Sequence, residues 1–354
     1  MHKLVFSIFF CAFCFWGNCP VLAQFSNDSL TDNWGPRVKG MPLPRGLEVS
    51  YKANLDYPVH STSTLLGPGR GEVEKNRIFT IKLKFPFLNK PKLKIAGGFM
   101  YSDEEFHFDD MPSNGYALYQ SLNEKNLKSL GGALYFLMKG KNRSYFMLRM
   151  SGKFNGDYWK EHIGDVSQTN FLKFEIAPMM GWKLDPWKSW GVGVAFSYSF
   201  GEPLVFPVIS YNHTFNSRWG IEALLPAKFK LRYQSSRLTY WNLIGKLSGG
   251  SYSIHMDAPG LNDFKTLELR QSEVDVSMNL EKGLNDWLWI EMAAGYRMNL
   301  KFDVTNNNNN RYTLSGKRIS GKDYVIDSFV GGGAFLKIGM YITPSKSLIR
   351  KFGL

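Results

Sequence analysis

The stretch that decides the fold runs from Val330 to Ile342 and reads VGGGAFLKIGMYI. Every second residue, counted from Val330, is apolar or small, whereas the alternate positions are mixed and include Lys337. A period of two with one continuous apolar face is typical of a strand that has lipid on one side and a wet lumen on the other. We therefore predict that this stretch is a membrane-spanning β-strand.

Similar alternation recurs along the whole chain, and no comparable stretch shows sustained helical spacing. The alternation is clearest in the ranges 47–55, 79–85, 190–200, 219–233 and 288–302. The predicted fold class is therefore all-β, and the predicted architecture is an antiparallel transmembrane β-barrel.

The predicted number of strands depends on the range from Leu238 to Met256, once the range 219–233 is taken as one strand. Read as one strand, Leu238–Met256 leads to thirteen strands, which would place the N-terminus and the C-terminus on opposite sides of the membrane. A break at Ser248-Gly249-Gly250 leads to fourteen, the even number usual in bacterial barrels. We predict fourteen strands, with twelve as the alternative.

Two other features of the strands bear on this topology. Pro178, Pro207 and Pro226 fall inside predicted strands, and each requires a bulge or a strand end because proline cannot donate a hydrogen bond. The connections are short and polar at 88–91, 140–143, 185–188, 216–217 and 281–286, and long at 59–75, 102–126, 155–169 and 305–322. Short turns at the periplasmic end and long loops outside the cell describe a bacterial outer-membrane barrel.

The N-terminal 23 residues have the pattern of a secretory signal peptide. Lys3 supplies the positive charge, Leu4–Trp16 the apolar region, and Val21-Leu22-Ala23 the cleavage site. We expect cleavage after Ala23, an N-terminal periplasmic segment over 24–45, the barrel over 46–343 and a periplasmic tail over 344–354. All three cysteines precede Ala23, so disulfides, cysteine-bound zinc and thiol catalysis are excluded for the expected mature chain.

The net charge of +13 suits partners that are anionic. No stretch resembles a nucleic-acid-binding module, and a secretory route argues against DNA as a partner. The expected partners are outer-membrane lipid, lipopolysaccharide and a small solute.

A row of basic side chains is the first candidate functional site. The alternation places these side chains on the side of the strands that faces the lumen, and they are Lys82, Lys84, Lys94, Lys228, Lys230 and Arg232. Basic groups inside a low-dielectric wall favour anions, so this row is a candidate anion path. The alternative is that the row is neutralised across a plugged lumen by Glu48, Glu175, Glu222, Glu268 and Glu291.

An acidic segment is the second candidate site, for a divalent cation. Its members, predicted to lie in an outer loop, are Asp103, Glu104, Glu105, His107, Asp109 and Asp110. Carboxylate oxygens could hold Ca²⁺ there, although the spacing is not that of an EF-hand. The alternative is a solvated loop without a metal, and no other cofactor is expected.

Two stretches carry a resemblance to a known family. They are Leu118–Leu122 with Leu127–Leu130, reading LYQSL and LKSL, and Trp219–Ala227, reading WGIEALLPA. Both resemble an uncharacterised outer-membrane barrel family of Bacteroidota, a domain of unknown function (DUF6268). The resemblance implies a location and a fold, and it implies no catalytic residues.

The function expected from these features is that of a non-enzymatic outer-membrane barrel that carries or binds small anionic or hydrophobic solutes. One alternative is an outer-membrane enzyme acting on lipid or lipopolysaccharide, with His213 or His107 involved, although no Gly-x-Ser-x-Gly elbow is present. The other alternative is a structural or surface-interaction protein whose long loops bind a partner.

Overall fold

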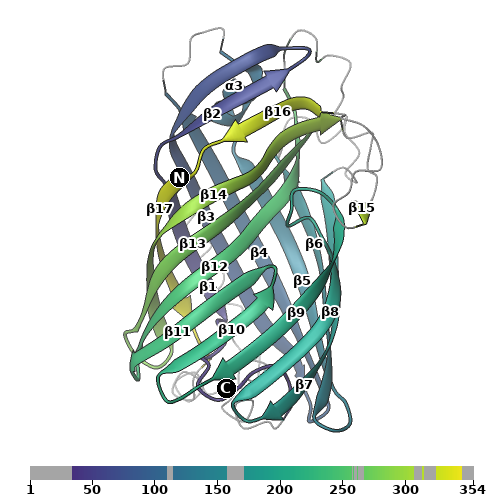
Figure 1. Ribbon diagram of the computed structural model, residues 1–354, viewed down its shortest axis with the longest axis vertical. Helices are drawn as coiled ribbons and strands as arrows, with labels where there is room; N and C mark the ends of the chain where they lie inside the picture. Colours follow the sequence, from purple (N-terminus) through teal and green to yellow (C-terminus); the bar gives the residue numbers. More distant parts are fainter. Residues whose placement is uncertain are drawn as a thin grey trace, which may run out of the picture.

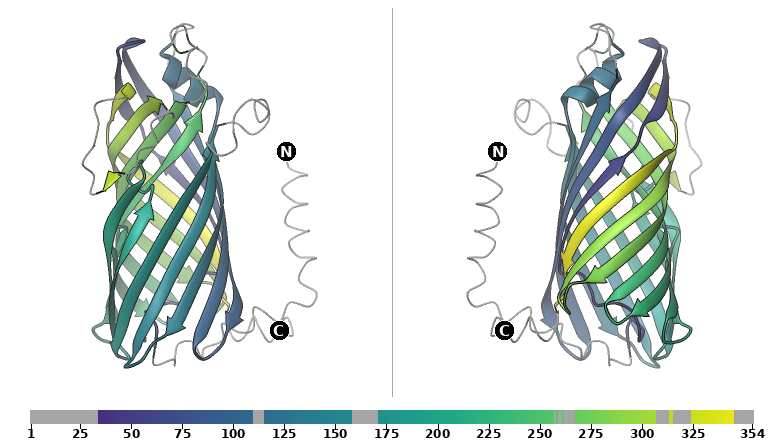
Figure 2. Two further views of the ribbon diagram at one scale, coloured as in Figure 1. Left: turned by 90° about the vertical axis from the view of Figure 1, so that its right-hand side faces the viewer. Right: turned by 90° about the vertical axis from the view of Figure 1, so that its left-hand side faces the viewer.

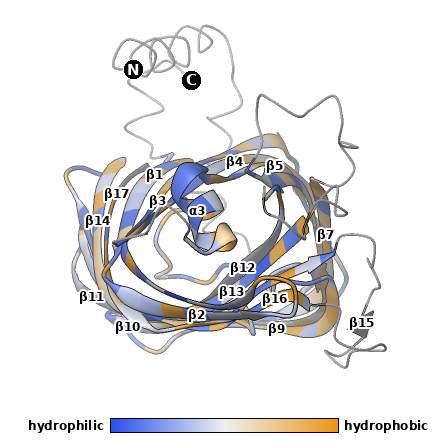
Figure 3. Ribbon diagram, turned by 90° about the horizontal axis from the view of Figure 1, so that it is seen from above, coloured by the Kyte–Doolittle hydropathy of each residue, from blue (hydrophilic) through white to orange (hydrophobic). Residues whose placement is uncertain are grey.

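The computed structural model describes residues 34–109, 115–157, 171–256, 258, 261, 267–306, 313–314 and 324–344. In this part of the chain, one β-sheet closes on itself as a barrel, and a short helix lies inside its upper end (Figures 1 and 3). None of the described helical residues form a helix long and apolar enough to cross a bilayer. The expected signal peptide and the tail beyond residue 344 lie outside the described residues.

The elements follow one another in this order: β1 (Leu47–Asn54), β2 (Tyr57–Ser63), β3 (Gly67–Asn89), β4 (Leu93–Phe108), α3 (Ala117–Glu124), β5 (Leu127–Lys139), β6 (Ser144–Gly156), β7 (Leu172–Asp185), β8 (Lys188–Ser197), β9 (Leu204–Thr214), β10 (Trp219–Leu225), β11 (Lys228–Ser236), β12 (Thr239–Ile254), β13 (Leu267–Gly283), β14 (Leu288–Asn306), β15 (Thr313–Leu314), β16 (Tyr324–Val330) and β17 (Gly333–Ile342).

The barrel has fourteen antiparallel strands, which confirms the predicted number and fold class. Among the described elements, β1 and β2 are two parts of one strand, as are β16 and β17. The two-residue β15 pairs in parallel with β9 and is not counted as a strand of the barrel. The ring closes where β1 pairs with β17 on one side and with β3 on the other, with Leu47 opposite Ile342 and Leu83. An even number of strands places the beginning of β1 and the end of β17 at the same lower mouth (Figure 1).

The break predicted within the range Leu238–Met256 is wrong, although the number of fourteen strands is right. Strand β12 pairs with β13 without interruption from Thr239 to Ile254, so Ser248-Gly249-Gly250 is no turn. The additional strand comes instead from the range 219–233, which divides at Pro226 into the hairpin β10–β11. A strand end at Pro226 fits the requirement of proline, since its nitrogen has no hydrogen to donate to a neighbouring strand.

Strands β10 and β11 are short, and above their hairpin the sheet forms a second, smaller ring. The end of β6 meets the end of β12 there, with Gly156 opposite Ser253. Among the described strands, β2, β3, β4, β5, β6, β12, β13, β14 and β16 then pair in a closed cycle of nine. The lumen is therefore wider at the lower end than at the upper end, because barrel diameter grows with strand number.

The upper parts of β7, β8 and β9 cover the outward face of β12 and β13. Lys173 on β7 pairs with Glu268 at 3.3 Å, and Ser272 Oγ donates to the carbonyl oxygen of Ser199 at 3.2 Å. Glu268 and Ser253 are opposite each other on the outward face, yet both are fully buried. The upper wall is therefore double on this side, with a polar seam between its two layers.

The alternation of the stretch from Val330 to Ile342 is interrupted at its start. Leu336, Ile338 and Met340 point outward and are exposed, as predicted, whereas Phe335 and Tyr341 are buried inside. Val330 faces the interior instead, because Gly331 and Gly332 separate β16 from β17 and the side chains change sides across this break. The outward residues of the other strands continue the exposed apolar belt around the barrel.

Candidate functional site

The barrel encloses a polar chamber of about 630 Å³ below the ring of nine strands. Its wall is built from inward-facing residues of β1, β3, β4, β5, β6, β10, β11, β12, β13, β14 and β17. Four of the six basic residues predicted to face the lumen line it, and they are Lys82, Lys84, Lys228 and Lys230. The period of two brings them together, since each lies on the inner side of its strand.

The charged residues that line the chamber have an excess of positive charge. The ten basic ones are Arg37, Arg45, Lys52, Lys82, Lys84, Lys153, Lys228, Lys230, Lys246 and Lys337. The seven acidic ones are Glu48, Glu104, Glu222, Glu273, Asp275, Glu281 and Glu291. The net charge of this lining is therefore +3, and the surrounding low-dielectric wall strengthens its field.

Most of the acidic side chains are already engaged by nearby cations. Arg45 contacts Glu281 at 3.1 Å, Glu291 at 2.7 Å and Glu48 at 3.2 Å, and its guanidinium lies 4.1 Å from the ring centre of Tyr341.

Two further carboxylates, Glu273 and Asp275, share Lys52, at 3.4 Å and 2.8 Å respectively. Of the carboxylates expected to neutralise the basic row, Glu48 lies 3.7 Å from Lys82 and Glu222 lies 3.3 Å from Arg232. Glu268 instead pairs with Lys173 in the seam of the upper wall.

Three chamber lysines, Lys84, Lys228 and Lys246, have no carboxylate within 4 Å among the described residues. Lys84 lies 5.6 Å from the ring centre of Tyr135, while Lys228 and Lys246 stand opposite each other on β11 and β12. All three are exposed to the space inside the barrel. Lys246 was not among the predicted site residues, although its alternation with Asn242 and Ile244 could have placed it on the inner face.

The other two predicted residues, Lys94 and Arg232, do not line the chamber but contact a segment that crosses its lower mouth. We call this segment, Trp34–Arg45, the strap (Figure 2). The ammonium of Lys94 lies 5.1 Å from the ring centre of Trp34. Arg232 is buried, pairs with Glu222 at 3.3 Å and donates to the carbonyl oxygen of Gly40.

Inward-facing side chains of the wall hold the backbone of the strap. Ser189 and Asn212 both donate to the carbonyl oxygen of Pro36, at 2.6 Å and 3.0 Å. Lys183 donates to the carbonyl oxygen of Arg37 at 2.7 Å. These contacts run from β7, β8 and β9 across to Arg45 beside β13 and β14, so the strap spans the mouth.

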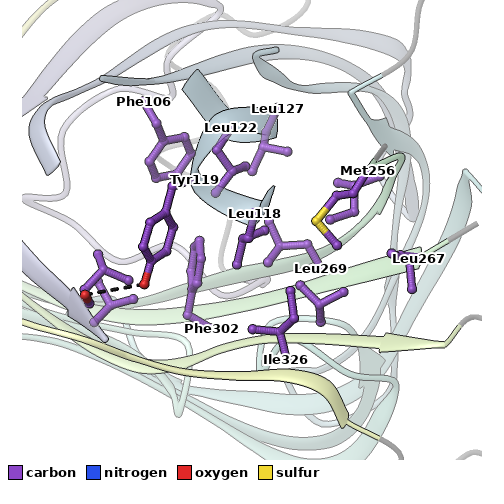
Figure 4. Close-up of a cluster of buried hydrophobic side chains, with 14 of the residues drawn as sticks. Phe106, Leu118, Tyr119, Leu122, Leu127, Met256, Leu267, Leu269, Phe302 and Ile326 are labelled. Atoms are coloured by element: carbon purple, nitrogen blue, oxygen red, sulfur yellow. Dashed lines mark hydrogen bonds between the residues drawn. The ribbon is translucent and has the colours of Figure 1, made fainter. Parts of the chain in front are cut away.

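An apolar cluster, which we call the roof, closes the upper end of the barrel. It packs α3 against the inner face of the ring of nine strands, and its core consists of Phe106, Leu118, Tyr119, Leu122, Leu127, Leu267, Leu269, Phe302 and Ile326 (Figure 4). The Tyr119 hydroxyl is bonded to Ser61 at 2.8 Å. A cavity of about 10 Å³ beside the cluster has room for roughly one water, so the roof is tightly packed.

A buried carboxyl, Asp157, joins β6 to β12 at this upper end. Its Oδ2 accepts the backbone N–H of His255 at 3.1 Å, while its Oδ1 is buried without a partner. Burial raises the pKa of Asp157 to about 6, although the nearby charge of Lys125 opposes the shift.

The acidic segment does not form the loop predicted for it. Asp103–Phe108 belong to β4, so successive side chains point to opposite faces of the sheet. Glu104 is buried inside and accepts from Asn76 at 3.0 Å, whereas Glu105 and His107 point outward and are exposed. The described residues contain no group of three potential ligands for a metal ion, and Asp110 lies outside them.

The histidine considered for an enzymatic function, His213, lies on the outward face of β9. Its ring contacts Phe215 with centroids 4.6 Å apart, and its Nδ1 is 3.2 Å from the hydroxyl of Tyr211. This is an aromatic setting near the lower rim. Among the described residues, no serine or carboxylate is bonded to His213.

The family model described as a domain of unknown function (DUF6268) matches residues 113–340. No curated protein matches the chain.

Among solved structures, the chain is similar to an outer membrane channel from Pseudomonas putida F1, with 10% identity, a TM-score of 0.37, and coverage of 86% of this chain and 97% of the other. It is similar to the toluene transporter TodX of Pseudomonas putida, with 11% identity, a TM-score of 0.34, and coverage of 90% and 93%. The NanC porin shares 7% identity at a TM-score of 0.33, with coverage of 84% and 100%. Similarities of this degree assign no solute to this chain.

Proposed function

This chain belongs to the family described as a domain of unknown function (DUF6268), and we propose that it is an integral outer-membrane channel for small polar solutes, with a preference for anions. The observation that carries the proposal is the net charge of +3 on the lining of the chamber. Positive potential inside a low-dielectric wall attracts anions and repels cations.

The exposed apolar belt and the closed sheet support the outer-membrane location. A closed barrel leaves no unpaired strand edge in lipid, and outward residues such as Leu336 and Ile338 suit contact with acyl chains. Lipid and lipopolysaccharide are the partners this surface would meet. Cleavage after Ala23 and an origin in Bacteroidota remain predictions from the sequence.

The interior favours polar solutes over hydrophobic ones. The chamber is lined by charged groups, whereas the cavity beside the apolar roof has room for about one water. Because the strap spans the lower mouth and the roof closes the upper end, passage requires one or both to move. We therefore expect a small and intermittent conductance rather than that of a wide open pore.

The two alternative functions have less support from the site. An enzyme acting on lipid would need both a nucleophile and a carboxylate beside its histidine. His213 has aromatic neighbours instead. His107 lies 3.6 Å from Glu74 on the exposed outer surface, and no described serine is bonded to it. A surface-interaction protein would place its function in the long upper loops, not in the chamber. Neither alternative accounts for the unpaired lysines of the chamber.

The test is the reversal potential of the purified, folded protein in a planar bilayer under a tenfold KCl gradient. We expect a reversal potential displaced toward that of chloride, and Lys228→Glu with Lys246→Glu should displace it toward that of potassium. The matched control is Lys139→Glu, which changes an exposed residue at the lower end of β5, outside the lining of the chamber.

A variant without residues 34–44 extends the test to the closed mouth. We expect removal of most of the strap to increase the open time or the conductance. A folded barrel that carries no current either with the strap or without it would overturn the channel proposal.

A further inference from the structure

Two of the unpaired lysines form a like-charge pair across neighbouring strands. Lys228 on β11 stands directly opposite Lys246 on β12, and both side chains face the chamber. Opposite residues on one face of an antiparallel pair have Cβ atoms roughly 4.5–5.5 Å apart, and like charges in such a pair are destabilising. The fold therefore keeps two ammonium groups close together at a cost in stability.

No carboxylate of the described residues is available to relieve this repulsion. The two carboxylates whose charges act on Lys228 are committed elsewhere, because Glu222 pairs with Arg232 at 3.3 Å and Glu281 pairs with Arg45 at 3.1 Å. On the other side of Lys246, its register partner Asp275 is held by Lys52 at 2.8 Å.

A third cation, Lys82, lines the same chamber as the pair. Lys246 on β12 and Lys82 on β3 are close enough to repel each other electrostatically. Lys82 is only weakly compensated, since its nearest carboxylate, Glu48, lies 3.7 Å away and is also 3.2 Å from Arg45. Three ammonium groups from three strands thus border one water-accessible space with too few carboxylates.

We propose that Lys228, Lys246 and Lys82 form a binding site for a compact dianion, either a small dicarboxylate or a phosphate group. A ligand with two negative charges can contact both members of the cross-strand pair at once, whereas a monoanion compensates only one of them. Lysine is well suited to this task because its ammonium group is a mobile point charge with three donors. The proposal deepens the proposed function and rests on it for the route by which the ligand enters.

The test is calorimetric titration of the full chain, folded in detergent at low ionic strength, with succinate, inorganic phosphate and acetate as probes. We expect succinate or phosphate to bind at least tenfold more tightly than acetate. The comparison of succinate with phosphate shows whether the site prefers a dicarboxylate or a phosphate group. Neutral succinamide should give no heat of binding.

Variants then locate the site. Lys228→Gln with Lys246→Gln should reduce the affinity for the dianion at least tenfold, and it should remove the preference for a dianion over acetate. The control Lys139→Gln loses one charge outside the chamber and should bind as the unaltered protein does. Folding is verified by heat-dependent migration in gels, and neutralising a repulsive pair is not expected to destabilise the barrel.

The outcomes separate this inference from the channel proposal. Equal affinity for dianion and acetate, or unchanged dianion affinity in Lys228→Gln with Lys246→Gln, would overturn the site even if the barrel conducts anions. Binding that depends on the two lysines in a barrel that carries no current would support the site while removing the channel.

Discussion

Arg45 is expected to contribute more to the stability of the barrel than any exposed arginine. Its side chain bridges Glu281 and Glu291, which are buried, and Glu48, which is partly buried, so Arg45→Ala would leave three carboxylates without their shared cation. Removing one partner of a buried ion pair costs about 3–5 kcal/mol. We expect the lower end, about 3 kcal/mol, because each carboxylate keeps another partner, such as Lys337 at 3.2 Å from Glu291.

The assay is urea unfolding of the barrel folded in lipid vesicles, followed by tryptophan fluorescence. A loss of about 3 kcal/mol corresponds to a change of roughly a hundredfold in the unfolding equilibrium constant. Arg218→Ala removes the same charge from an exposed turn and should change the free energy of unfolding by less than about 0.5 kcal/mol. Equal effects of the two substitutions would refute the assignment of Arg45 as the junction between strap and wall.

Three further predictions concern the roof, the strap and the upper end. Leu118→Ala removes a fully buried side chain from α3 and should destabilise the protein by about 2–5 kcal/mol, measured by the same unfolding assay, with exposed Leu65→Ala as the control. A Cβ at Gly40 would lie 3.0 Å from Thr214 Cγ2, so Gly40→Cys with Thr214→Cys should form a disulfide that fixes the strap to β9. The bond carries a cost in stability, because φ at Gly40 is 83°, a conformation that favours glycine. Oxidation should then lower the bilayer current, and a reductant should restore it. A current that neither oxidation nor reduction changes would contradict movement of the strap. The pKa of Asp157 is raised to about 6 in the folded protein, so the folded protein binds a proton at this carboxyl more tightly than the unfolded chain does. The free energy of unfolding should therefore fall as pH rises from about 4 to about 6. Asp157→Asn should remove this part of the pH dependence of the urea midpoint, and an unaltered pH profile would count against it.

Much of the wall follows from the period of two, which is a local property of the sequence. The alternation around Leu336 and Ile338 predicts both the fold class and the side of each residue. The same rule placed Lys82, Lys84, Lys228 and Lys230 on the lumen side, where they line the chamber.

The features that were missed depend on pairing between distant residues. The contact between Gly156 and Ser253 creates the ring of nine strands, and no local pattern predicts which of two strand ends will meet. Helix α3 has only eight residues, too few for a periodic signal, and its apolar side chains are meaningful only inside that ring. The charges of the acidic segment are typical of a solvated loop, yet β4 continues through the segment to Phe108.

In the upper part of this barrel, an outward-facing side chain of β12 or β13 does not meet lipid, because the wall there has two layers. By alternation alone, Ser253 and Glu268 would be assigned to lipid, where an ionised side chain is costly. Since β7, β8 and β9 stand between these residues and the bilayer, the membrane imposes no hydrophobic requirement on that part of β12 and β13. Lipid contact can be mapped by labelling single-cysteine variants with a membrane-restricted reagent. A cysteine at Leu243, which is exposed on the lower part of β12, should be labelled, whereas a cysteine at Ser253, higher on the same strand, should not.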